Sequence, residues 1–392
     1  MTALAGAVLR VDVRSLATRH GDFTVHVCRD LMRRTYLLVL ARGALSAREP
    51  LLARVHSSCV TSETFGGCDC DCSEQLDAAL AAIAAAGRGV VFYLDQEGRG
   101  AGFSAKVRDR MLVQASGGRL GTFDAYARMG LPSDLRAYDA VAAACRALGV
   151  AAPLRLLTNN PEKLAMLAGL GVPLAGAVPL ALPPSPFNRH YLAAKTAAGH
   201  GLSVAGADDE ATPPAPPEVV APRALPEAPT LIGLGSYWLP VRRWADPDAT
   251  PAWFRLHAYV DAVRGRERVV LTLGDTGTTP VLLRVQRESL LERVRGPAPG
   301  LEQSRWLATL RAFAAHGAGV AIMETDEHGD SLFPIASRSE DAAANATLAR
   351  RHLGGRAAVP LVAAAEQGAA AWPAALAAAG VALEPPRALA AA

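Results

Sequence analysis

Residues 73–94 read SEQLDAALAAIAAAGRGVVFYL and join a helical pattern to a strand pattern. The apolar residues of 73–85 recur at helical spacing, which predicts a helix with Ser73 as its N-cap and Gly87 at its end. The run Val90–Leu94 is continuously apolar, as is typical of a strand buried on both faces. A helix that leads into a buried strand indicates an α/β sheet.

Further strands are predicted on both sides of this stretch. Alternating or short apolar runs at Thr24–Val27, Leu51–Val55 and Leu154–Leu157 favour strands. The predicted fold class is therefore α/β, with a mixed sheet and flanking helices.

The chain is predicted to divide at a proline-rich segment. Residues 203–229 contain seven prolines and almost no large apolar residue, so this segment should be an extended linker. It separates a domain over residues 1–202 from a domain over residues 230–392. At 392 residues the chain has the length of two ordinary domains.

The two predicted domains resemble each other. Five stretches recur in the same order, at offsets between about 205 and 231, which favours an internal duplication over chance similarity. The pairs are FTVHVCRD at 23–30 with FRLHAYVD at 254–261, PLLARVHSSC at 50–59 with PVLLRVQRES at 280–289, GRGVVF at 87–92 with GAGVAI at 317–322, Leu148-Gly149 with Leu353-Gly354, and AGLGV at 168–172 with AAAGV at 377–381.

Composition and charge exclude several classes of protein. With 51% apolar and 20% charged residues the chain can bury a core, and its net charge of +3 predicts neither nucleic acid nor an anionic membrane as a partner. The N-terminus has no basic region before its short apolar run, unlike a secretory signal. The alanine-rich stretch 357–383 is interrupted by Glu366 and Pro373, so we expect a helix and a strand there and not a membrane span. A cytoplasmic location is the resulting expectation.

Cysteine usage points to a metal. Six cysteines in so long a chain do not make a disulfide scaffold. Three of them, Cys59, Cys70 and Cys72, have C-x10-C-x-C spacing, and three thiolates suit a zinc ion with a fourth position open for water. A structural zinc with Cys68 as fourth ligand, or reduced core thiols, would show the same spacing.

Three further motifs are candidate phosphate-binding elements. Gln96-Glu-Gly-Arg-Gly100 follows the predicted strand Val90–Leu94, where glycines allow a close backbone approach and Arg99 could meet a phosphate. Thr158-Asn-Asn-Pro161 lies between a strand and a helix that carries Lys163, at the strand end where α/β sheets bind ligands. Ordinary turn and helix-capping chemistry would explain both motifs equally well. Asp134-Leu-Arg136 would usually be a solvated surface pair.

Taken in order, these motifs resemble those of the GTP cyclohydrolase II family. The resemblance extends over residues 8–202. It rests on Arg54-Val-His-Ser-Ser-Cys59, Cys70-Asp-Cys72, Glu74-Gln-Leu76, Gln96–Gly100, Lys106-Val-Arg108, Asp134-Leu-Arg136, Leu156–Lys163, Asn188–Lys195 and Gly199-His-Gly-Leu202.

The resemblance implies a reaction and a set of roles. It implies a hydrolase that opens the guanine imidazole ring of GTP and releases formate and pyrophosphate. Zinc on Cys59, Cys70 and Cys72 would supply the hydroxide, and Mg²⁺ would accompany the triphosphate. Arg136 would be the nucleophile at the α-phosphate, with Asp134 as its proton acceptor. The implied nucleotide-binding residues are Arg54, Val55, His56, Ser57, Ser58, Gln75, Glu97, Gly98, Arg99, Thr122, Thr158 and Lys163.

Several residues depart from the family pattern. Ser58 stands in place of a glutamate, Cys68 in place of an apolar residue, Asp95 in place of an arginine or histidine, and Arg110 in place of a tyrosine beside the guanine ring. Two alternatives follow from this drift: a related enzyme that stops at the formamidopyrimidine, or a catalytically weak nucleotide-binding regulatory protein. The nucleotide is expected to be GTP or a related purine nucleotide.

The second domain is predicted to be a degenerate, non-catalytic copy. Ser289, Gly300 and Glu302 align with the three cysteines and cannot form the thiolate site, and Ala363–Glu366 aligns with the Thr158–Pro161 motif. Arg284 and Glu327 remain as counterparts of Arg54 and Glu97. Because family members are generally homodimers, this copy could act as the partner in an intramolecular pseudo-dimer; a homo-oligomer is the other expectation.

Overall fold

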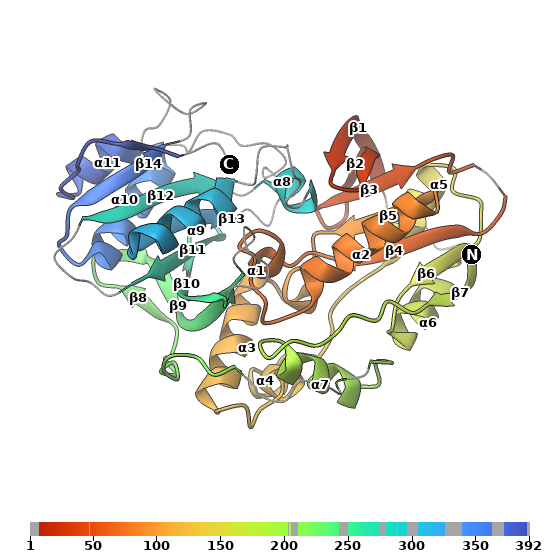
Figure 1. The fold of residues 1–392 in the computed structure, drawn as a ribbon, viewed down its shortest axis with the longest axis horizontal. Coiled ribbons are helices and arrows are strands. Elements are labelled where there is room, and N and C mark those ends of the chain that lie inside the picture. The colour runs from red at the N-terminus through yellow and green to blue at the C-terminus, as the bar shows by residue number, and fades with distance from the viewer. Residues whose placement is uncertain are drawn as a thin grey trace.

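A computed structural model gives the fold for residues 8–46, 48–202, 204, 211–242, 250–274, 280–287, 289–295, 305–325, 339–362 and 372–389. It forms two mixed α/β halves that lie against each other (Figure 1). Among the described residues, no helix is both long and apolar enough to cross a membrane.

The first half is a seven-stranded sheet with helices on both faces, in the order β1-β2-β3-β5-β4-β6-β7. The first three strands run antiparallel, whereas β5, β4, β6 and β7 are parallel neighbours. Its elements are β1 Val8–Thr18, β2 Gly21–Asp30, β3 Tyr36–Arg42, β4 Leu51–Ser57, α1 Val60–Glu63, α2 Cys72–Ala85, β5 Gly89–Leu94, the 3₁₀ turn η1 Gly98–Gly100, α3 Phe103–Ala115, α4 Thr122–Arg128, α5 Asp139–Ala147, β6 Leu154–Leu157, α6 Pro161–Gly169, β7 Leu174–Val178 and α7 Arg189–Ala197.

The second half repeats this arrangement. Its sheet has the order β8-β9-β10-β11-β13-β12-β14-β15, which is the order of the first sheet with β8 added at one edge. Its elements are β8 Arg223–Leu225, β9 Ala228–Val241, β10 Ala252–Asp261, β11 Arg266–Leu273, β12 Val281–Arg287, α8 Leu290–Arg295, α9 Arg305–His316, β13 Gly319–Thr325, α10 Ser339–Leu353, β14 Ala358–Val362, α11 Trp372–Ala378 and β15 Arg387–Ala388.

The two copies share even an irregularity. The pairing of β1 with β2 shifts between Arg10 and Asp12, and the pairing of β9 with β10 shifts at the corresponding place, opposite Ala258 and Tyr259. A bulge at the same place in two equivalent strand pairs is hard to explain by chance. The predicted duplication and the predicted α/β class are confirmed.

The predicted elements are found with small changes. The helix predicted from Ser73 begins at Cys72 with Asp71 as N-cap, so Ser73 lies inside the first turn. Residues 211–222 have no helix or strand, and β8 and the start of β9 occupy the last residues of the predicted linker because they pair with each other at the sheet edge. In the alanine-rich stretch, β14 and α11 supply the predicted strand and helix.

The halves contact each other reciprocally. Val60 of α1 packs into the apolar cluster of the second half, which includes Trp306 and Phe254. Leu290 and Val294 of α8, the counterpart of α1, pack into the cluster of the first half. Such an exchange of equivalent helices has the form of a twofold interface.

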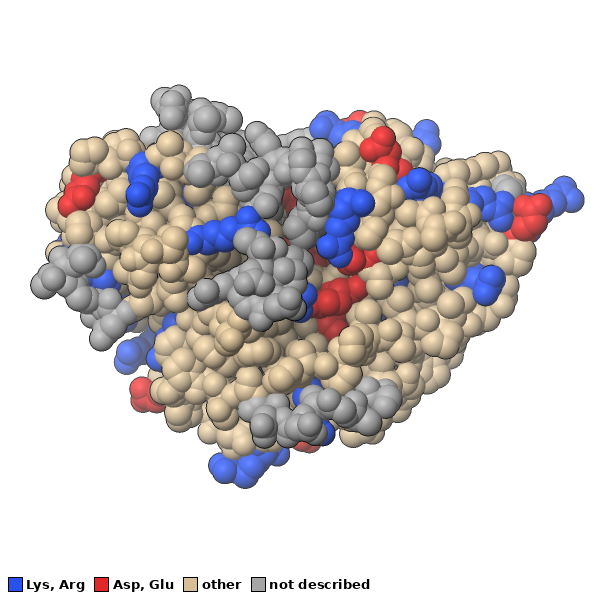
Figure 2. Space-filling view, viewed as in Figure 1, with Lys and Arg blue, Asp and Glu red and all other residues tan. Residues whose placement is uncertain are grey.

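A second contact between the halves has no counterpart among the described residues. Helix α3 lies on β9 and buries Phe103, Val107 and Met111 against the second half (Figure 1). On the face shown in Figure 2, acidic and basic side chains gather at the junction of the halves. Charged residues of both halves also line a cavity of about 250 Å³ at this junction, including Asp77, Glu74, Arg242 and Arg293.

Candidate active site

The three predicted metal ligands lie together. Cys59 caps α1, Cys70 lies in the loop that follows, and Cys72 begins α2. Their sulfur atoms all lie within 4.8 Å of one another, with 3.7 Å between Cys59 Sγ and Cys70 Sγ. Three ligands of a tetrahedral zinc with Zn–S bonds of about 2.3 Å are roughly 3.8 Å apart, so the three thiols could hold this metal. Within the described part of the chain they are the sole cluster of this kind.

Cys68 is not part of this cluster. Its Sγ donates to the carbonyl oxygen of Pro240 at 3.3 Å, away from the other three thiols. Burial raises the pKa of Cys68 to about 12, so this side chain stays a neutral thiol.

A cation lies beside the thiol cluster. Lys106 Nζ is 2.9 Å from Cys59 Sγ and 2.9 Å from Glu97 Oε1. Glu97 in turn accepts from the backbone N–H groups of Val60 and Gly98. Glu97 therefore fixes α1, η1 and Lys106 relative to one another, and it is not among the residues that line the adjacent pocket.

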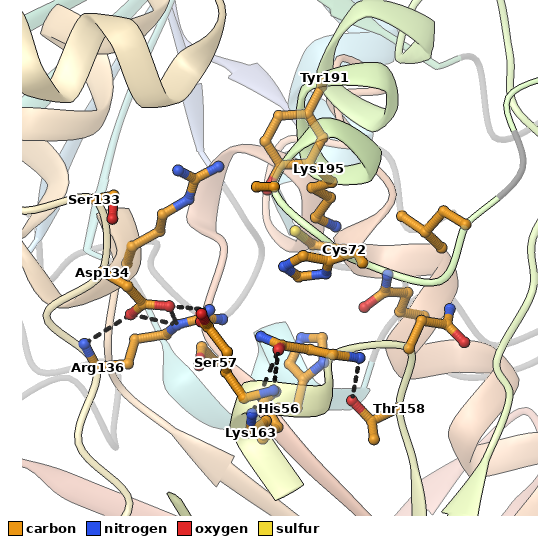
Figure 3. A pocket seen from close by; sticks show the side chains of 18 of the residues that line it. His56, Ser57, Cys72, Ser133, Asp134, Arg136, Thr158, Lys163, Tyr191 and Lys195 are labelled. Carbon is orange, nitrogen blue, oxygen red and sulfur yellow. Dashed lines mark hydrogen bonds and ion pairs between the residues drawn. The ribbon is translucent and has the colours of Figure 1, made fainter. Parts of the chain in front are cut away.

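A pocket opens next to Cys72 and is rich in basic side chains (Figure 3). Arg54 comes from β4, Arg99 from η1, Lys163 from α6 and Lys195 from α7, and Arg136 lies on the loop before α5. The lining also includes His56, Ser57, Gln75, Phe123, Ser133, Asp134, Thr158, Asn159, Asn160, Glu162, Tyr191, Ala198, His200 and Leu202.

Several of these cations are poorly neutralised within the protein. Lys163 Nζ donates to the carbonyl oxygen of Val55 at 2.9 Å, and burial, with the charges of Arg54, Arg136 and Lys195, lowers its pKa well below the usual value. The terminal nitrogens of Arg99 make no hydrogen bond within the described residues, and the guanidinium lies 4.0 Å from the Phe123 ring centroid. Crowded cations of this kind are typical of a site that binds an anion.

Arg136 is held by Asp134 in a fork of hydrogen bonds. Arg136 Nε lies 2.9 and 3.1 Å from the two carboxylate oxygens, and Arg136 Nη2 also bonds Asp134 (Figure 3). Although burial favours the neutral carboxyl, Arg136 holds the pKa of Asp134 below its usual value, and the pKa of Arg136 is raised in return. The loop is fixed where Leu135 N donates to Arg99 O, beside Gly100. Gly100 has φ +83°, and a Cβ there would lie 2.8 Å from the Leu135 backbone, so only glycine fits.

Of the other predicted nucleotide-binding residues, some line the pocket and others do not. Arg54 donates to Leu157 O at 2.8 Å and to Gln75 Oε1, and burial lowers its pKa to about 10. Thr158 Oγ1 faces the pocket and accepts from Asn160 N. By contrast Ser58, Gly98 and Thr122 do not line the pocket, and the Val55 side chain is in the core. Thr122 instead donates to Asp109 at 2.9 Å.

Helix α7 adds pocket residues that the prediction of the site omitted. Lys195 Nζ lies 2.8 Å from Asp71 Oδ1 and 4.8 Å from the Tyr191 ring centroid. In the sequence Asp71 stands between Cys70 and Cys72. His200 follows the helix, and Gly201 N donates to Asn159 O, so the segment is tied over the pocket. The motifs of residues 188–202 were part of the family resemblance, but their positions along the chain did not indicate a contact with the cysteines.

Arg110 lies outside the pocket. It is buried, with Nε 3.2 Å from Asp69 Oδ2 and its guanidinium 4.6 Å from the Tyr191 ring centroid. The family pattern places this position beside the guanine ring. In this structure the Arg110 guanidinium lies instead over the Tyr191 ring.

In the second half, Arg284 keeps the position of Arg54. It is fully buried, and its Nη1 donates to Leu361 O at 3.1 Å, as Arg54 does to Leu157 O. Ser289, the counterpart of Cys59, accepts from Glu292 N at 3.4 Å. Gly300, Glu302, Glu327 and Ala363–Glu366 lie outside the described residues.

The GTP cyclohydrolase II family model matches residues 10–179 and again residues 247–358. This chain belongs to the GTP cyclohydrolase II family. The predicted family and its hydrolase class are thereby confirmed, and both halves carry the family pattern.

Curated relatives match about half of this chain. A riboflavin biosynthesis protein RibBA of Bacillus cytotoxicus is 42% identical over 190 residues, which are 48% of this chain and 47% of the relative. The RibBA of Cytophaga hutchinsonii is 41% identical over 180 residues, 46% and 44% of the two chains. A GTP cyclohydrolase-2 of Pseudomonas putida is 40% identical over 196 residues, 50% of this chain and 94% of the relative. The chain spans about half the length of the RibBA relatives.

Among solved structures, RibBX, a two-domain 3,4-dihydroxy-2-butanone 4-phosphate synthase from A. baumannii, shares 17% identity over 45% of this chain and 41% of its own. The TM-score of 0.26 is too low to compare the folds.

Proposed function

We propose that the first half is a zinc-dependent hydrolase that opens the guanine imidazole ring of GTP, with release of formate and pyrophosphate, to give a diaminopyrimidinone ribosylamino phosphate. The observation that carries this proposal is the pocket in which Cys72 of the thiol cluster meets Arg54, Arg99, Arg136, Lys163 and Lys195. The thiol cluster suits a metal, and the basic side chains of the pocket suit a polyphosphate.

Cys59, Cys70 and Cys72 would hold the zinc. When bound, zinc would lower the pKa of a water ligand to roughly 7 and so supply hydroxide at neutral pH. Lys106 lies beside Cys59 and would balance part of the negative charge of the thiolates, and Glu97 holds the Lys106 ammonium in place.

The cations would orient the triphosphate, with which Mg²⁺ is expected to bind. A phosphate near Lys163 and Arg99 would neutralise charges that the protein itself leaves crowded. Asp134 is in hydrogen-bond contact with Arg136 and is therefore placed to take a proton from the guanidinium if Arg136 attacks the α-phosphate. As a protonated cation the same side chain would instead stabilise charge on the phosphate.

The second half would serve as an internal, non-catalytic partner. The reciprocal packing of α1 and α8 supports a pseudo-dimer within one chain, because each helix fills the apolar cluster of the other half.

A second candidate reaction stops at the formamidopyrimidine. It is favoured by the absence of a tyrosine from residues 103–115, where the family pattern places one and this chain has Arg110.

One assay tests the function. The full chain is incubated with GTP, zinc and Mg²⁺, and formate, pyrophosphate and product mass are measured. Equal amounts of formate and product support complete ring opening, whereas a formylated product without formate supports the second candidate. Cys70→Ser should abolish both, and Cys145→Ser, which alters a buried thiol outside the cluster, should not. Unmodified GTP with zinc-loaded wild type would exclude both reactions.

A further inference from the structure

We propose that the second half stabilises the metal site, because its strand β9 pairs with the loop that leads to Cys70 and Cys72. The proposal rests on zinc as the metal of the proposed function. It concerns how tightly the site keeps the metal, which can be measured without the reaction.

The backbone of the metal-binding loop continues the second sheet. Gly67 forms an antiparallel bridge with Val241 at the end of β9. Cys68 N donates to Pro240 O at 2.9 Å, and Arg242 N donates to Gly66 O at 2.9 Å. Residues 66–68 thus pair with β9 as a short added strand, directly before Cys70.

Side chains also contribute to the contact between this loop and β9. A Cβ on Gly67 would lie 2.7 Å from Leu239 Cδ1 and 2.7 Å from Thr61 O, so loop and strand touch without space for a side chain. Cys68 Sγ adds its own bond to Pro240 O. Arg242 forms an ion pair with Glu74, which lies in the first turn of α2 just after Cys72.

Tyr237 of β9 is buried in an apolar cluster with Val60, which directly follows Cys59. Its side chain is fully buried, and its hydroxyl has no hydrogen-bond partner among the described residues. The charges that act on this phenol belong to the first half, namely Asp69, Lys106, Arg110 and Cys59. The second half therefore contributes part of the surroundings of the metal ligands.

Helix α8 makes a second connection. Arg293 lies 3.6 Å from Asp95 and donates to the Tyr93 hydroxyl at 3.4 Å. Tyr93 and His56 both bond Glu63, so a buried polar chain runs from the second half to His56 at the pocket.

These contacts account for departures from the family pattern. Cys68 bonds Pro240 and Asp95 faces Arg293. Ser58 donates to Asp95, and the charge of Arg110 acts on the Tyr237 phenol. Two of the departures, Cys68 and Asp95, thus contact the second half directly, and Ser58 adjoins one of them.

The test measures zinc release from the intact chain to a chromogenic chelator at neutral pH. Arg242→Pro removes the N–H that bonds Gly66 O as well as the side chain that pairs with Glu74. Proline is tolerated here because Val241 before it is extended. We expect zinc release to be about ten-fold faster, since a backbone carbonyl also loses its partner. Arg242→Ala removes the side chain alone, and we expect release about two- to three-fold faster.

Arg351→Ala is the matched control. It breaks an Arg–Glu pair with Glu227 in the same half but away from the metal site, and should release zinc as wild type does. Zinc release at the wild-type rate from folded Arg242→Pro overturns the proposal, and if that variant does not fold, the same result with Arg242→Ala does. An inactive wild type that shows the expected release rates would refute the proposed function alone.

Discussion

The chain has only three lysines, and all of them lie at the candidate active site: Lys106, Lys163 and Lys195. The other members of the 40 Lys and Arg residues are arginines. Lysine is a compact charge whose pKa responds strongly to burial, unlike the guanidinium. The pKa of Lys163 is lowered by burial, whereas the thiols and Glu97 raise that of Lys106 despite its burial. In a chain so rich in arginine, a lysine thus marks a position where a point charge is needed.

Arg136 is the residue whose role can be separated from the metal. Arg136→Ala should abolish pyrophosphate release, because the variant lacks both a nucleophile and a cation at the phosphate end of the pocket. It should keep its zinc, since Arg136 bonds Asp134 and not the cysteines. Arg14→Ala is the matched control, because Asp12 and Arg14 form the same i, i+2 pair on exposed β1. Undiminished pyrophosphate from Arg136→Ala would rule out the role.

The sequence predicted single residues well where the chemistry is local to a motif. The three clustered cysteines and four of the five pocket cations were predicted from spacing and from the family resemblance. Lys195, Tyr191 and His200 were not assigned to the site, since only folding brings α7 to the cysteines. Cys68 and Asp95 were recognised only as departures from the family pattern, because the sequence cannot show that they contact the other half.

At the scale of elements, α7 closes the pocket from a distant part of the chain. It is attached at one point by Lys195 to Asp71 and at another by Gly201 to Asn159. The strands that position the site were predictable because β5 is continuously apolar and β4 and β6 contain short apolar runs. Strands β1 and β9 were not predicted, because they lie near sheet edges and mix exposed with buried positions.

Removing the α7 attachment should weaken nucleotide binding. Lys195→Met deletes the cation and its bond to Asp71, and we expect KM for GTP to rise about ten-fold, the usual order for a charge-assisted contact. Arg189→Ala, at the start of the same helix but outside the pocket, should leave KM unchanged. An unaltered KM in Lys195→Met would mean that α7 does not touch the nucleotide.

At the scale of the whole molecule, the linker should be dispensable for holding the halves together. A protease site inserted after Pro214, in an exposed segment without helix or strand, allows the chain to be cut after folding. Because α1, α8, α3 and β9 bury apolar side chains across the junction, the fragments should co-elute on size exclusion. Separation of the fragments at micromolar concentration would refute an internal partner.

The second half should lose stability in acid. The rings of His257 and His352 lie 4.4 Å apart; burial lowers the pKa of His352 to about 4 and that of His257 well below its usual value. Arg255 and Arg351 also face this pair, and Tyr259 bonds His352. Between pH 6.5 and 4 the unfolded chain therefore binds more protons, and the free energy of unfolding should fall by about 1 kcal/mol per pH unit for each of the two histidines.

Tryptophan fluorescence in urea measures this, since all five tryptophans follow residue 230. His352→Gln should flatten the pH dependence. An equally steep dependence in that variant would assign the effect to other groups.

The bulged strands β1 and β9 began as the same strand, yet they now meet different surroundings. Leu9, Val11 and Val13 of β1 are exposed, whereas Leu234, Tyr237 and Leu239 of β9 are buried against the first half. In a homodimer every substitution appears twice, so one sequence must satisfy both environments at once. Fusion removes that restriction: β9 can be altered to suit the metal loop while β1 is left alone. Covalent linkage thereby lets natural selection tune a single catalytic centre through a surface that never has to perform catalysis itself.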